Sequence, residues 1–247
     1  MRNVLITGGS RGIGRATALL CGERGWSVTI NYRRDGQAAD ATAAAVAAAG
    51  GRAVTAMGDI STEANVVAAF DAAEAAFGRL DGVVINAGIV GESLRLADMT
   101  ADRLRRLIDV NVYGAYLCAR ECARRLPKDR GGNGGSVVIV SSAAARLGSP
   151  SEYVDYAGCK AAQDTLVIGL SKELGPQGVR VNAVRPGLIE TEIHASGGQP
   201  DRARRLGGGT PLGRPGTAEE VAQAIVWLLG EASSYVTGAL LDVAGGR

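Results

Sequence analysis

Two tyrosines and a lysine stand close together in the stretch SPSEYVDYAGCKAAQDTL, residues 149 to 166. On a helix, Tyr156 and Lys160 lie at positions i and i+4 and share one face, with Tyr153 about one turn earlier. A phenol beside an ammonium can serve as a general acid/base. The same pair is also typical of a surface contact worth about 0.3 kcal/mol, so the rest of the chain must decide between the two interpretations.

The acid/base interpretation is energetically feasible. A free tyrosine has a pKa of about 10, so acid/base work near neutral pH needs a depression of about three units, or about 4 kcal/mol. An ammonium about 4 Å away contributes an interaction of about that size at an effective dielectric of about 20. We therefore expect Lys160 to lower the pKa of Tyr156.

Predicted strands and helices, which would position these residues, alternate along the chain. Short apolar runs rich in β-branched residues predict strands at 3–7, 27–32, 52–57, 82–86, 136–141, 179–184 and 239–243. Stretches of helical period predict helices at 15–24, 36–49, 62–77, 100–126, 154–174 and 217–229. Such alternation indicates βαβ units and a mostly parallel sheet. We expect an α/β fold in which one doubly wound parallel sheet of about seven strands is covered by helices on both faces, in a single domain spanning 1–247.

A glycine-rich loop follows the first predicted strand. The segment LITGGSRGIGRATA places Gly8, Gly12 and Gly14 between a strand and a helix. Glycines permit a tight turn and close backbone approach, and a helix N-terminus offers free N–H groups to a pyrophosphate. In this position the loop favours nucleotide binding over a plain structural turn.

The end of the second predicted strand bears on which dinucleotide binds. Selectivity for NAD normally places an acidic residue about 20 residues after the loop. This chain has Tyr32, Arg33 and Arg34 there, and Arg11 lies inside the glycine loop. Guanidinium groups suit a 2′-phosphate, so NADP(H) is favoured. Asp35 could instead serve as the acid, which leaves NAD(H) as the alternative.

The composition of the chain argues against several other classes of protein. The 247 residues carry a formal net charge of +2, which gives no electrostatic footprint for nucleic acid. No apolar run reaches the roughly 18 residues of a membrane span, and the N-terminus does not resemble a signal peptide. The four cysteines are too scattered for a disulfide framework, and the only histidine is His194, so we expect no metal site. We expect a cytoplasmic protein.

Spaced motifs along the whole chain resemble the short-chain dehydrogenase/reductase family, in its classical type, which has a Rossmann-type fold. The motifs are TGGSRGIG (7–14), GDI (58–60), NAG (86–88), DVNVYG (109–114), VSS (140–142), the Tyr156/Lys160 pair and RPGLIETEI (185–193). The resemblance implies an NAD(P)-dependent enzyme that interconverts a carbonyl and an alcohol. It implies that the catalytic residues are Asn111, Ser142, Tyr156 and Lys160.

The resemblance also implies which residues meet the cofactor. Together with the loop and strand residues above, they are Gly8, Ser10, Arg11, Gly12, Ile13, Gly14, Tyr32, Arg33, Arg34, Asp59, Ile60, Asn86, Ala87, Gly88, Tyr156, Lys160, Pro186, Gly187, Ile189 and Thr191. By the same resemblance, Lys160 also holds the nicotinamide ribose, and Asn111 supports a water link to Lys160.

One departure from the family pattern concerns the serine. Most members place it thirteen residues before the tyrosine, but here that position is Ala143, and Ser142 lies fourteen before Tyr156. A one-residue insertion in RLGSPSEYVD accounts for this and leaves Ser142 in its usual place. Tyr153 has no lysine four residues later, so Tyr156 is the catalytic candidate, and we expect Tyr153 to border the substrate.

Residues 188–215 correspond to the family's substrate-covering segment. Ser142, Tyr153 and His194 are the substrate-binding candidates, although a local polar contact is an equal alternative for His194. Arg202, Arg204 and Arg205 could form a solvated helix face or attract an acidic acyl-carrier partner. Similar enzymes include 3-oxoacyl-carrier-protein reductases and glucose 1-dehydrogenases, and a non-catalytic dinucleotide-binding regulatory protein is an alternative of another class. Family members are usually tetramers, sometimes dimers, so we expect a homotetramer or a dimer acting on a small molecule.

Overall fold

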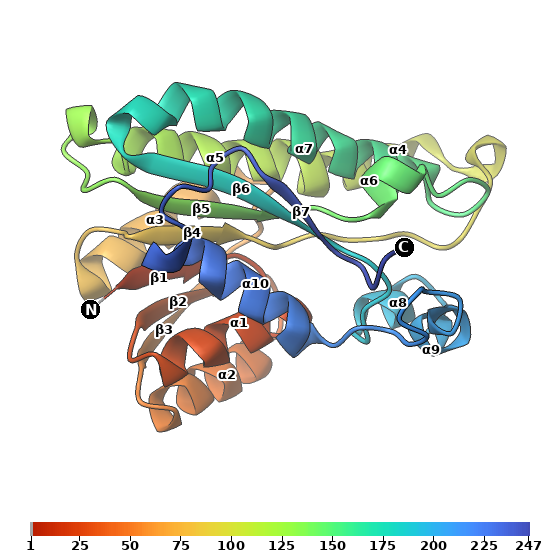
Figure 1. The fold of residues 1–247 in the computed structure, drawn as a ribbon, viewed down its shortest axis with the longest axis horizontal. Coiled ribbons are helices and arrows are strands. Elements are labelled where there is room, and N and C mark those ends of the chain that lie inside the picture. Colours follow the sequence, from red (N-terminus) through yellow and green to blue (C-terminus); the bar gives the residue numbers. More distant parts are fainter. Residues whose placement is uncertain (1) are drawn as a thin grey trace.

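The computed structural model describes residues 2–247, and a single parallel sheet organises them (Figure 1). Its strands run in the order β3-β2-β1-β4-β5-β6-β7, and every neighbouring pair is parallel. The strands are β1 (Asn3–Ile6), β2 (Ser27–Tyr32), β3 (Arg52–Met57), β4 (Gly82–Ile85), β5 (Gly135–Val140), β6 (Val179–Pro186) and β7 (Leu240–Val243). The order reverses between β1 and β4, and in such sheets ligands bind outside the carboxyl ends of the strands at this point. The predicted seven-stranded, doubly wound fold is confirmed.

Helices cover both faces of the sheet, as Figure 1 shows. The α-helices are α1 (Gly12–Glu23), α2 (Gly36–Ala48), α3 (Glu63–Phe77), α4 (Ala101–Ile108), α5 (Gly114–Arg125), α6 (Ala144–Leu147), α7 (Val154–Leu174), α8 (Ile193–Ser196), α9 (Arg202–Gly207) and α10 (Ala218–Leu229). Four short 3₁₀ helices lie at Leu96–Asp98, Lys128–Arg130, Gly175–Gln177 and Glu231–Ser233. Buried residues of α1, α2 and α10 pack on one face, and those of α3, α5 and α7 pack on the other.

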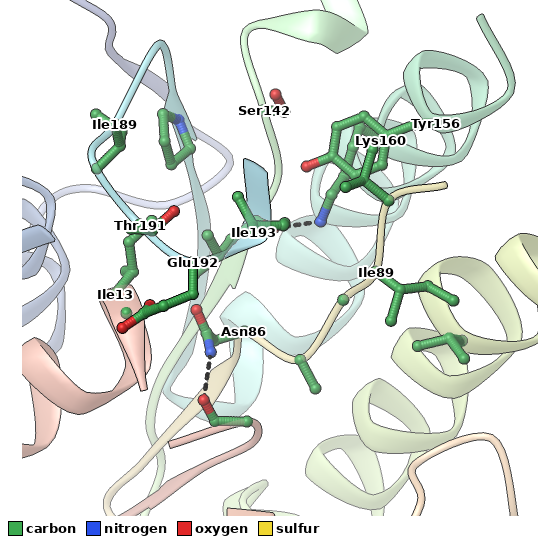
Figure 2. Close-up of a pocket in the computed structure, with 18 of the residues that line it drawn as sticks. Ile13, Asn86, Ile89, Ser142, Tyr156, Lys160, Ile189, Thr191, Glu192 and Ile193 are labelled. Atoms are coloured by element: carbon green, nitrogen blue, oxygen red, sulfur yellow. Dashed lines mark hydrogen bonds between the residues drawn. The ribbon is translucent and has the colours of Figure 1, made fainter. Parts of the chain in front are cut away.

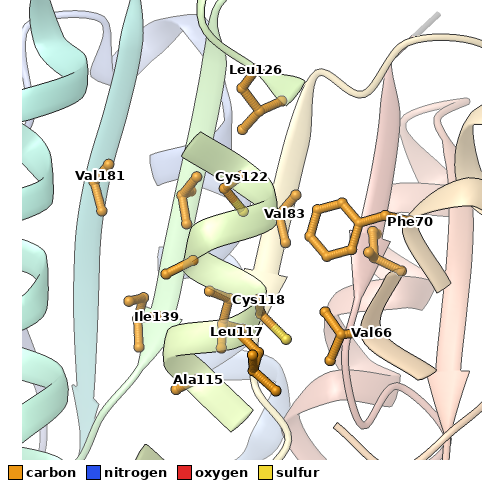
Figure 3. Close-up of a cluster of buried hydrophobic side chains, with 14 of the residues drawn as sticks. Val66, Phe70, Val83, Ala115, Leu117, Cys118, Cys122, Leu126, Ile139 and Val181 are labelled. Atoms are coloured by element: carbon orange, nitrogen blue, oxygen red, sulfur yellow. The ribbon is translucent and has the colours of Figure 1, made fainter. Parts of the chain in front are cut away.

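The core beneath α3 and α5 is almost entirely apolar (Figure 3). Phe70 and Val66 of α3 meet Val83 of β4, and Cys118 and Cys122 of α5 are fully buried. Burial raises the pKa of the Cys118 thiol to about 12. These thiols therefore pack as small apolar groups within the core.

The predicted helix 100–126 is interrupted. One π-helical turn, Asp109–Tyr113, separates α4 from α5. Gly114 follows it and packs against Ile60, since a Cβ at Gly114 would lie 2.9 Å from Ile60 Cδ1. The extra residue per turn frees one backbone carbonyl, and such π-turns are frequent at functional sites.

The two α-helices of the 188–215 segment, α8 and α9, lie together at one corner of the molecule (Figure 1). A parallel bridge between Ile189 and Gly216 closes the base of this segment. Within residues 2–247, no helix combines the length and hydrophobicity needed to cross a membrane. The same residues contain no cluster of His, Cys, Asp and Glu suited to a metal ion.

Candidate active site

A cavity of about 530 Å³ lies at the carboxyl ends of the strands. Of the residues predicted from the sequence to bind cofactor or substrate or to act in catalysis, all but Gly14 and Asn111 line it. One end contains the β1 glycine loop and the end of β2, and the other contains Tyr153, His194 and Ser149. The sequence motifs therefore meet in one place, although they are spread over most of the chain.

The glycine loop is shaped by close backbone contacts. Gly8 has φ +64°, and a Cβ there would lie 2.9 Å from Ala87 Cα. Gly14 lies behind the cavity wall, where a Cβ would come within 2.4 Å of the Gly8 carbonyl oxygen. Asn86 secures the turn, because its Nδ2 donates to the carbonyl oxygens of Thr7 (2.9 Å) and Gly8 (3.0 Å). The loop leaves the space and the backbone N–H groups that a pyrophosphate needs, so the residues present fit a dinucleotide.

Charged residues surround the end of the cavity beyond the glycine loop. Arg11, Arg33 and Arg34 line it as expected, and Arg106 of α4 also lines it. Asp59 pairs with Arg33 (Nε to Oδ2, 2.7 Å) and Arg106 (Nη2 to Oδ2, 3.1 Å). Although burial acts in the opposite direction, hydrogen bonds from Ser61 and Arg106 hold the pKa of the Asp59 carboxyl below its usual value. Arg106 was not a candidate from the sequence.

Asp35 lines the same cavity and also caps a helix. Its Oδ1 accepts a hydrogen bond of 2.9 Å from the backbone N–H of Ala38 and so caps the N-terminus of α2. A capping carboxylate satisfies an otherwise free N–H group of the first helical turn.

The predicted catalytic tyrosine and serine lie beside each other at the cavity and share a hydrogen bond (Figure 2). Tyr156 comes from the first turn of α7, and Ser142 follows β5. The segment between them contains α6 and two non-glycine residues in the left-handed region, Ser149 (φ 44°) and Ser151 (φ 62°). Ser142 therefore reaches the tyrosine despite the altered spacing.

The pKa of Tyr156 does not follow the expectation from the sequence. Burial raises it to about 12, and the hydrogen bond with Ser142 lowers it only in part. The Lys160 ammonium lies 5.5 Å from the centroid of the Tyr156 ring, and burial lowers the pKa of Lys160 to about 8. Its Nζ donates to the carbonyl oxygen of Val140 (2.7 Å) and to Gln163 Oε1 (3.1 Å). The prediction that Lys160 lowers the pKa of Tyr156 is wrong for this structure. The Lys160 ammonium donates to Val140 and Gln163 instead, and burial removes both the Tyr156 and the Lys160 side chains from water.

Asn111 is fully buried in the π-turn. Its side chain bridges the backbone of Ile89, accepting from the N–H (Oδ1, 2.9 Å) and donating to the carbonyl oxygen (Nδ2, 2.9 Å). Gln163 connects it to the lysine, because Gln163 Nε2 donates to the Asn111 carbonyl oxygen at 2.6 Å while its Oε1 accepts from Lys160. Gln163 was also missed from the sequence, although its place three residues after Lys160 on one helix face is a usable signal.

Known proteins resemble the chain over its whole length. Residues 8–247 match the family model described as enoyl-(acyl carrier protein) reductase. The uncharacterized oxidoreductase YgfF of Escherichia coli K12 is 51% identical over 247 residues, 100% of each chain. The chain belongs to the short-chain dehydrogenase/reductase family. L-rhamnose 1-dehydrogenase (NAD(P)(+)) of Sphingomonas sp. SKA58 is 37% identical and matches 99% of this short-chain dehydrogenase/reductase and 95% of the relative.

Solved structures agree with this assignment. A 3-ketoacyl-(acyl-carrier-protein) reductase from Brucella melitensis, complexed with NADH, superposes with a TM-score of 0.91 at 30% identity, covering 100% of this chain and 98% of that one. A short-chain dehydrogenase from Burkholderia cenocepacia in complex with NADP gives a TM-score of 0.89 at 33% identity, covering 99% and 97%. The short-chain dehydrogenase/reductase described here is therefore a nicotinamide-dependent oxidoreductase with the Rossmann-type fold.

The arginines of α9 correct a further expectation. Arg202 is only 7% exposed, whereas Arg204 and Arg205 are exposed. Arg204 pairs with Glu190 (2.8 Å) and Arg205 with Gln199 (2.7 Å). Arg202 instead lines the cavity. The three do not share a solvated face, because α9 turns Arg202 inward against Glu152 and Tyr153, which precede α7.

Proposed function

We propose that the protein is an NADP(H)-preferring oxidoreductase that transfers a hydride between the nicotinamide and a carbonyl or alcohol substrate, with Tyr156 as general acid/base. The arrangement of the Tyr156 and Ser142 hydroxyls at one cavity, with the glycine loop at its far end, carries this proposal. A catalytic role is favoured over a regulatory one because the tyrosine, serine and lysine all line the same cavity. When bound, the nicotinamide cofactor supplies or accepts the hydride.

The residues of this chain handle the proton. Reduction of a carbonyl leaves an oxyanion that must be protonated as it forms. Tyr156, whose pKa is about 12, is protonated at neutral pH and can donate its proton to that oxygen. The Ser142 hydroxyl can donate a hydrogen bond to the same oxygen and so stabilise the developing charge. Lys160 and Asn111, linked through Gln163, hold the wall beside the tyrosine.

The preference for NADP(H) is supported by two features of the cavity. Three arginines, Arg11, Arg33 and Arg34, line the end of the cavity next to the glycine loop and β2, and guanidinium groups suit a 2′-phosphate. Asp35, the acidic residue that would favour NAD(H), also lines the cavity, but its Oδ1 accepts a hydrogen bond from the α2 N-terminus. An acid engaged as a helix cap is a poorer acceptor for ribose hydroxyls.

Other parts of the proposal concern the protein as a whole. We expect residues 1–247 to form one NAD(P)-binding domain, with 188–215 covering a small-molecule substrate, in a cytoplasmic protein. A homotetramer or dimer is supported by large side chains exposed on α5 and α7, including Tyr116 (44%) and Ile168 (41%). Size-exclusion chromatography with light scattering measures the assembly state.

Tyr156→Phe tests the mechanism. NADPH and NADH consumption is measured with a panel of ketones, aldehydes and acyl thioesters, and NADP⁺ and NAD⁺ reduction with sugars and alcohols. We expect kcat to fall about 100-fold or more, while NADPH affinity stays within about threefold, because only the proton donor is lost. Tyr235→Phe, at a fully exposed tyrosine, is the matched control. Near-normal turnover in Tyr156→Phe would contradict the assignment.

A further inference from the structure

Hydrocarbon side chains adjoin the catalytic hydroxyls on the side of the cavity away from the glycine loop. Ser142, which shares a hydrogen bond with Tyr156, is followed at once by Ala143 and Ala144, and all four residues line the cavity. The backbone N–H of Ala144 donates to Ser142 Oγ at 3.1 Å. Alanine therefore lies directly beside the hydroxyl that meets the substrate oxygen.

Leu147 extends this wall by one helical turn. Its backbone N–H donates to the Ala143 carbonyl oxygen at 3.0 Å, so the two residues lie at i and i+4 on the same side of α6. Leu147 also lines the cavity, and 39% of its surface is exposed, so a ligand can reach it. A substrate that extends from Ser142 along α6 thus meets methyl groups.

The loop after β4 and the start of α7 form the adjoining wall, where Val90 and Tyr153 line the cavity. Gly197 joins them, since a Cβ there would lie 3.3 Å from Val90 Cγ1 and 3.4 Å from the Tyr153 hydroxyl. Val90 also follows closely on Gly88, where a Cβ would lie 3.6 Å from Lys160 Nζ. This second wall is therefore tied to the catalytic lysine at one end and, through α7, to the catalytic tyrosine at the other.

Polar groups near these walls have partners within the protein. The Tyr153 hydroxyl accepts a hydrogen bond from Gln199 Nε2 at 3.1 Å, and Arg202 pairs with Glu152. Ser149 also lines the cavity, but it is exposed. The hydroxyl groups of a sugar each need a partner when they leave water, and the alanines, leucine and valine offer none.

Charged groups give little support to an anionic substrate. Arg247 lines the cavity, and its carbonyl oxygen accepts from Arg146 Nη2 at 2.6 Å, but the residue is exposed, so water and salt screen its charge. Glu192 lies toward the glycine loop, where its Oε2 is 3.6 Å from the position of a Cβ at Gly12. An uncharged substrate therefore fits the region beside Ser142 better than an anion does.

We propose that the enzyme prefers uncharged, apolar ketones and aldehydes, and the corresponding alcohols, over sugars and keto acids. Ala144, Leu147 and Val90 determine this specificity, because an apolar substrate and these side chains leave water together. This substrate class rests on the proposed carbonyl/alcohol chemistry at Tyr156.

Three small ketones test the substrate class. Pentan-3-one is apolar, dihydroxyacetone replaces both of its terminal methyl groups with hydroxyls of similar size, and 2-oxobutanoate replaces one ethyl group with a carboxylate. With NADPH, we expect kcat/KM for pentan-3-one to exceed that for each of the other two by about tenfold or more, because their polar groups would be buried without partners. Saturation-transfer NMR with Tyr156→Phe and NADPH measures ketone binding without turnover and should give the same order.

Leu147→Asn tests the α6 wall, because asparagine has a similar size and replaces two methyl groups with an amide. We expect the preference for pentan-3-one over dihydroxyacetone to fall about fivefold, since the amide can pair with a hydroxyl. Leu96→Asn, at an exposed leucine outside the residues that line the cavity, is the matched control and should leave the ratio unchanged.

Val90→Thr tests the second wall with almost no change of shape. The added hydroxyl should lower the same preference about threefold. Val154→Thr, at an exposed valine outside the cavity lining, is its control. An equal loss for both ketones in Leu147→Asn and in Val90→Thr would overturn the assignment of these walls to substrate recognition.

The ketone series also separates this proposal from the reaction class. If dihydroxyacetone is the best ketone of the wild-type enzyme, the site recognises hydroxyl groups and the proposal is overturned. If 2-oxobutanoate is the best, the site recognises anions, and the proposal is overturned as well. Either result leaves the reaction class standing. No NADPH consumption with any carbonyl compound would reject the reaction class itself, and with it the substrate class.

Discussion

Replacing Arg33 by alanine should weaken NADPH binding about 5- to 30-fold and leave NADH binding nearly unchanged. Arg33 follows β2, its side chain is 43% exposed, and it lines the cavity beside the glycine loop. Its Nε lies 2.7 Å from Asp59 Oδ2, so a bound 2′-phosphate must share the guanidinium with that carboxylate.

The magnitude follows from these two contacts. A unit charge pair at about 4 Å is worth about 1 kcal/mol in water and about 4 kcal/mol at an effective dielectric of about 20. Since Arg33 is nearly half exposed, a value of about 1.5 to 2.5 kcal/mol is reasonable for a phosphate. Weakening the partly exposed pair with Asp59 offsets about 0.5 kcal/mol of this. The net effect of about 1 to 2 kcal/mol corresponds to about 5- to 30-fold in affinity.

Fluorescence titration of NADPH and NADH at two salt concentrations measures this effect. The loss for NADPH should shrink at high salt, because exposed charges are screened. Arg105→Ala removes the same charge from the exposed face of α4 and is the control. Equal losses for NADPH and NADH, or no loss for NADPH, would refute the assignment of Arg33 to the 2′-phosphate.

Three further predictions concern Lys160 and two residues that lie behind the cavity wall. Gln163→Leu should lower kcat about tenfold and the free energy of unfolding by about 1 to 3 kcal/mol. The substitution leaves the Asn111 carbonyl oxygen unpaired and Lys160 with one acceptor fewer. Steady-state kinetics measures the first effect and urea denaturation the second. Lys160 has a pKa of about 8 when folded and about 10.5 when unfolded, so its contribution to stability is present above pH 10.5 and is lost as the pH falls through 8. Between pH 8 and 10.5, the free energy of unfolding of the wild type, measured by urea denaturation, should therefore rise by on the order of 3 kcal/mol relative to that of Lys160→Met. A difference between the two proteins that does not change with pH would contradict the low pKa of Lys160. Gly14→Ala should abolish NADPH binding in the same fluorescence titration or prevent folding, because the new Cβ would lie 2.4 Å from the Gly8 carbonyl oxygen. Gly158→Ala is the control and should bind NADPH normally, because Gly158 in α7 has open space around it.

The sheet and most of the cavity could be predicted from the sequence because their signals are local. Buried parallel strands read as continuous apolar runs, and the glycine loop needs its residue types at fixed spacing. The residues that line the cavity from these motifs follow directly once the strand order brings the strand ends together. The strand order itself was not predicted from the sequence and comes from the structure.

Residues that reach the cavity from elsewhere gave no comparable signal. Arg106 belongs to a helix whose charged face looks solvated, and in the structure it pairs with Asp59 and lines the cavity. Arg202 belongs to an arginine-rich segment, and only the fold shows that it turns inward toward Glu152. Long-range partners such as these depend on tertiary contacts that spacing along the chain does not encode.

The pKa of Tyr156 illustrates the same limit in energetic terms. The sequence places an ammonium one helical turn away, and charge alone then predicts a lowered pKa. In the structure, the Lys160 ammonium donates to Val140 and Gln163, and desolvation, which opposes ionisation of the phenol and protonation of the amine, is the larger effect for both groups. The chain by itself therefore holds Tyr156 as a protonated donor, the state that carbonyl reduction needs. Alcohol oxidation needs the deprotonated tyrosine, so it requires added positive charge near the phenol, or a higher pH than reduction does.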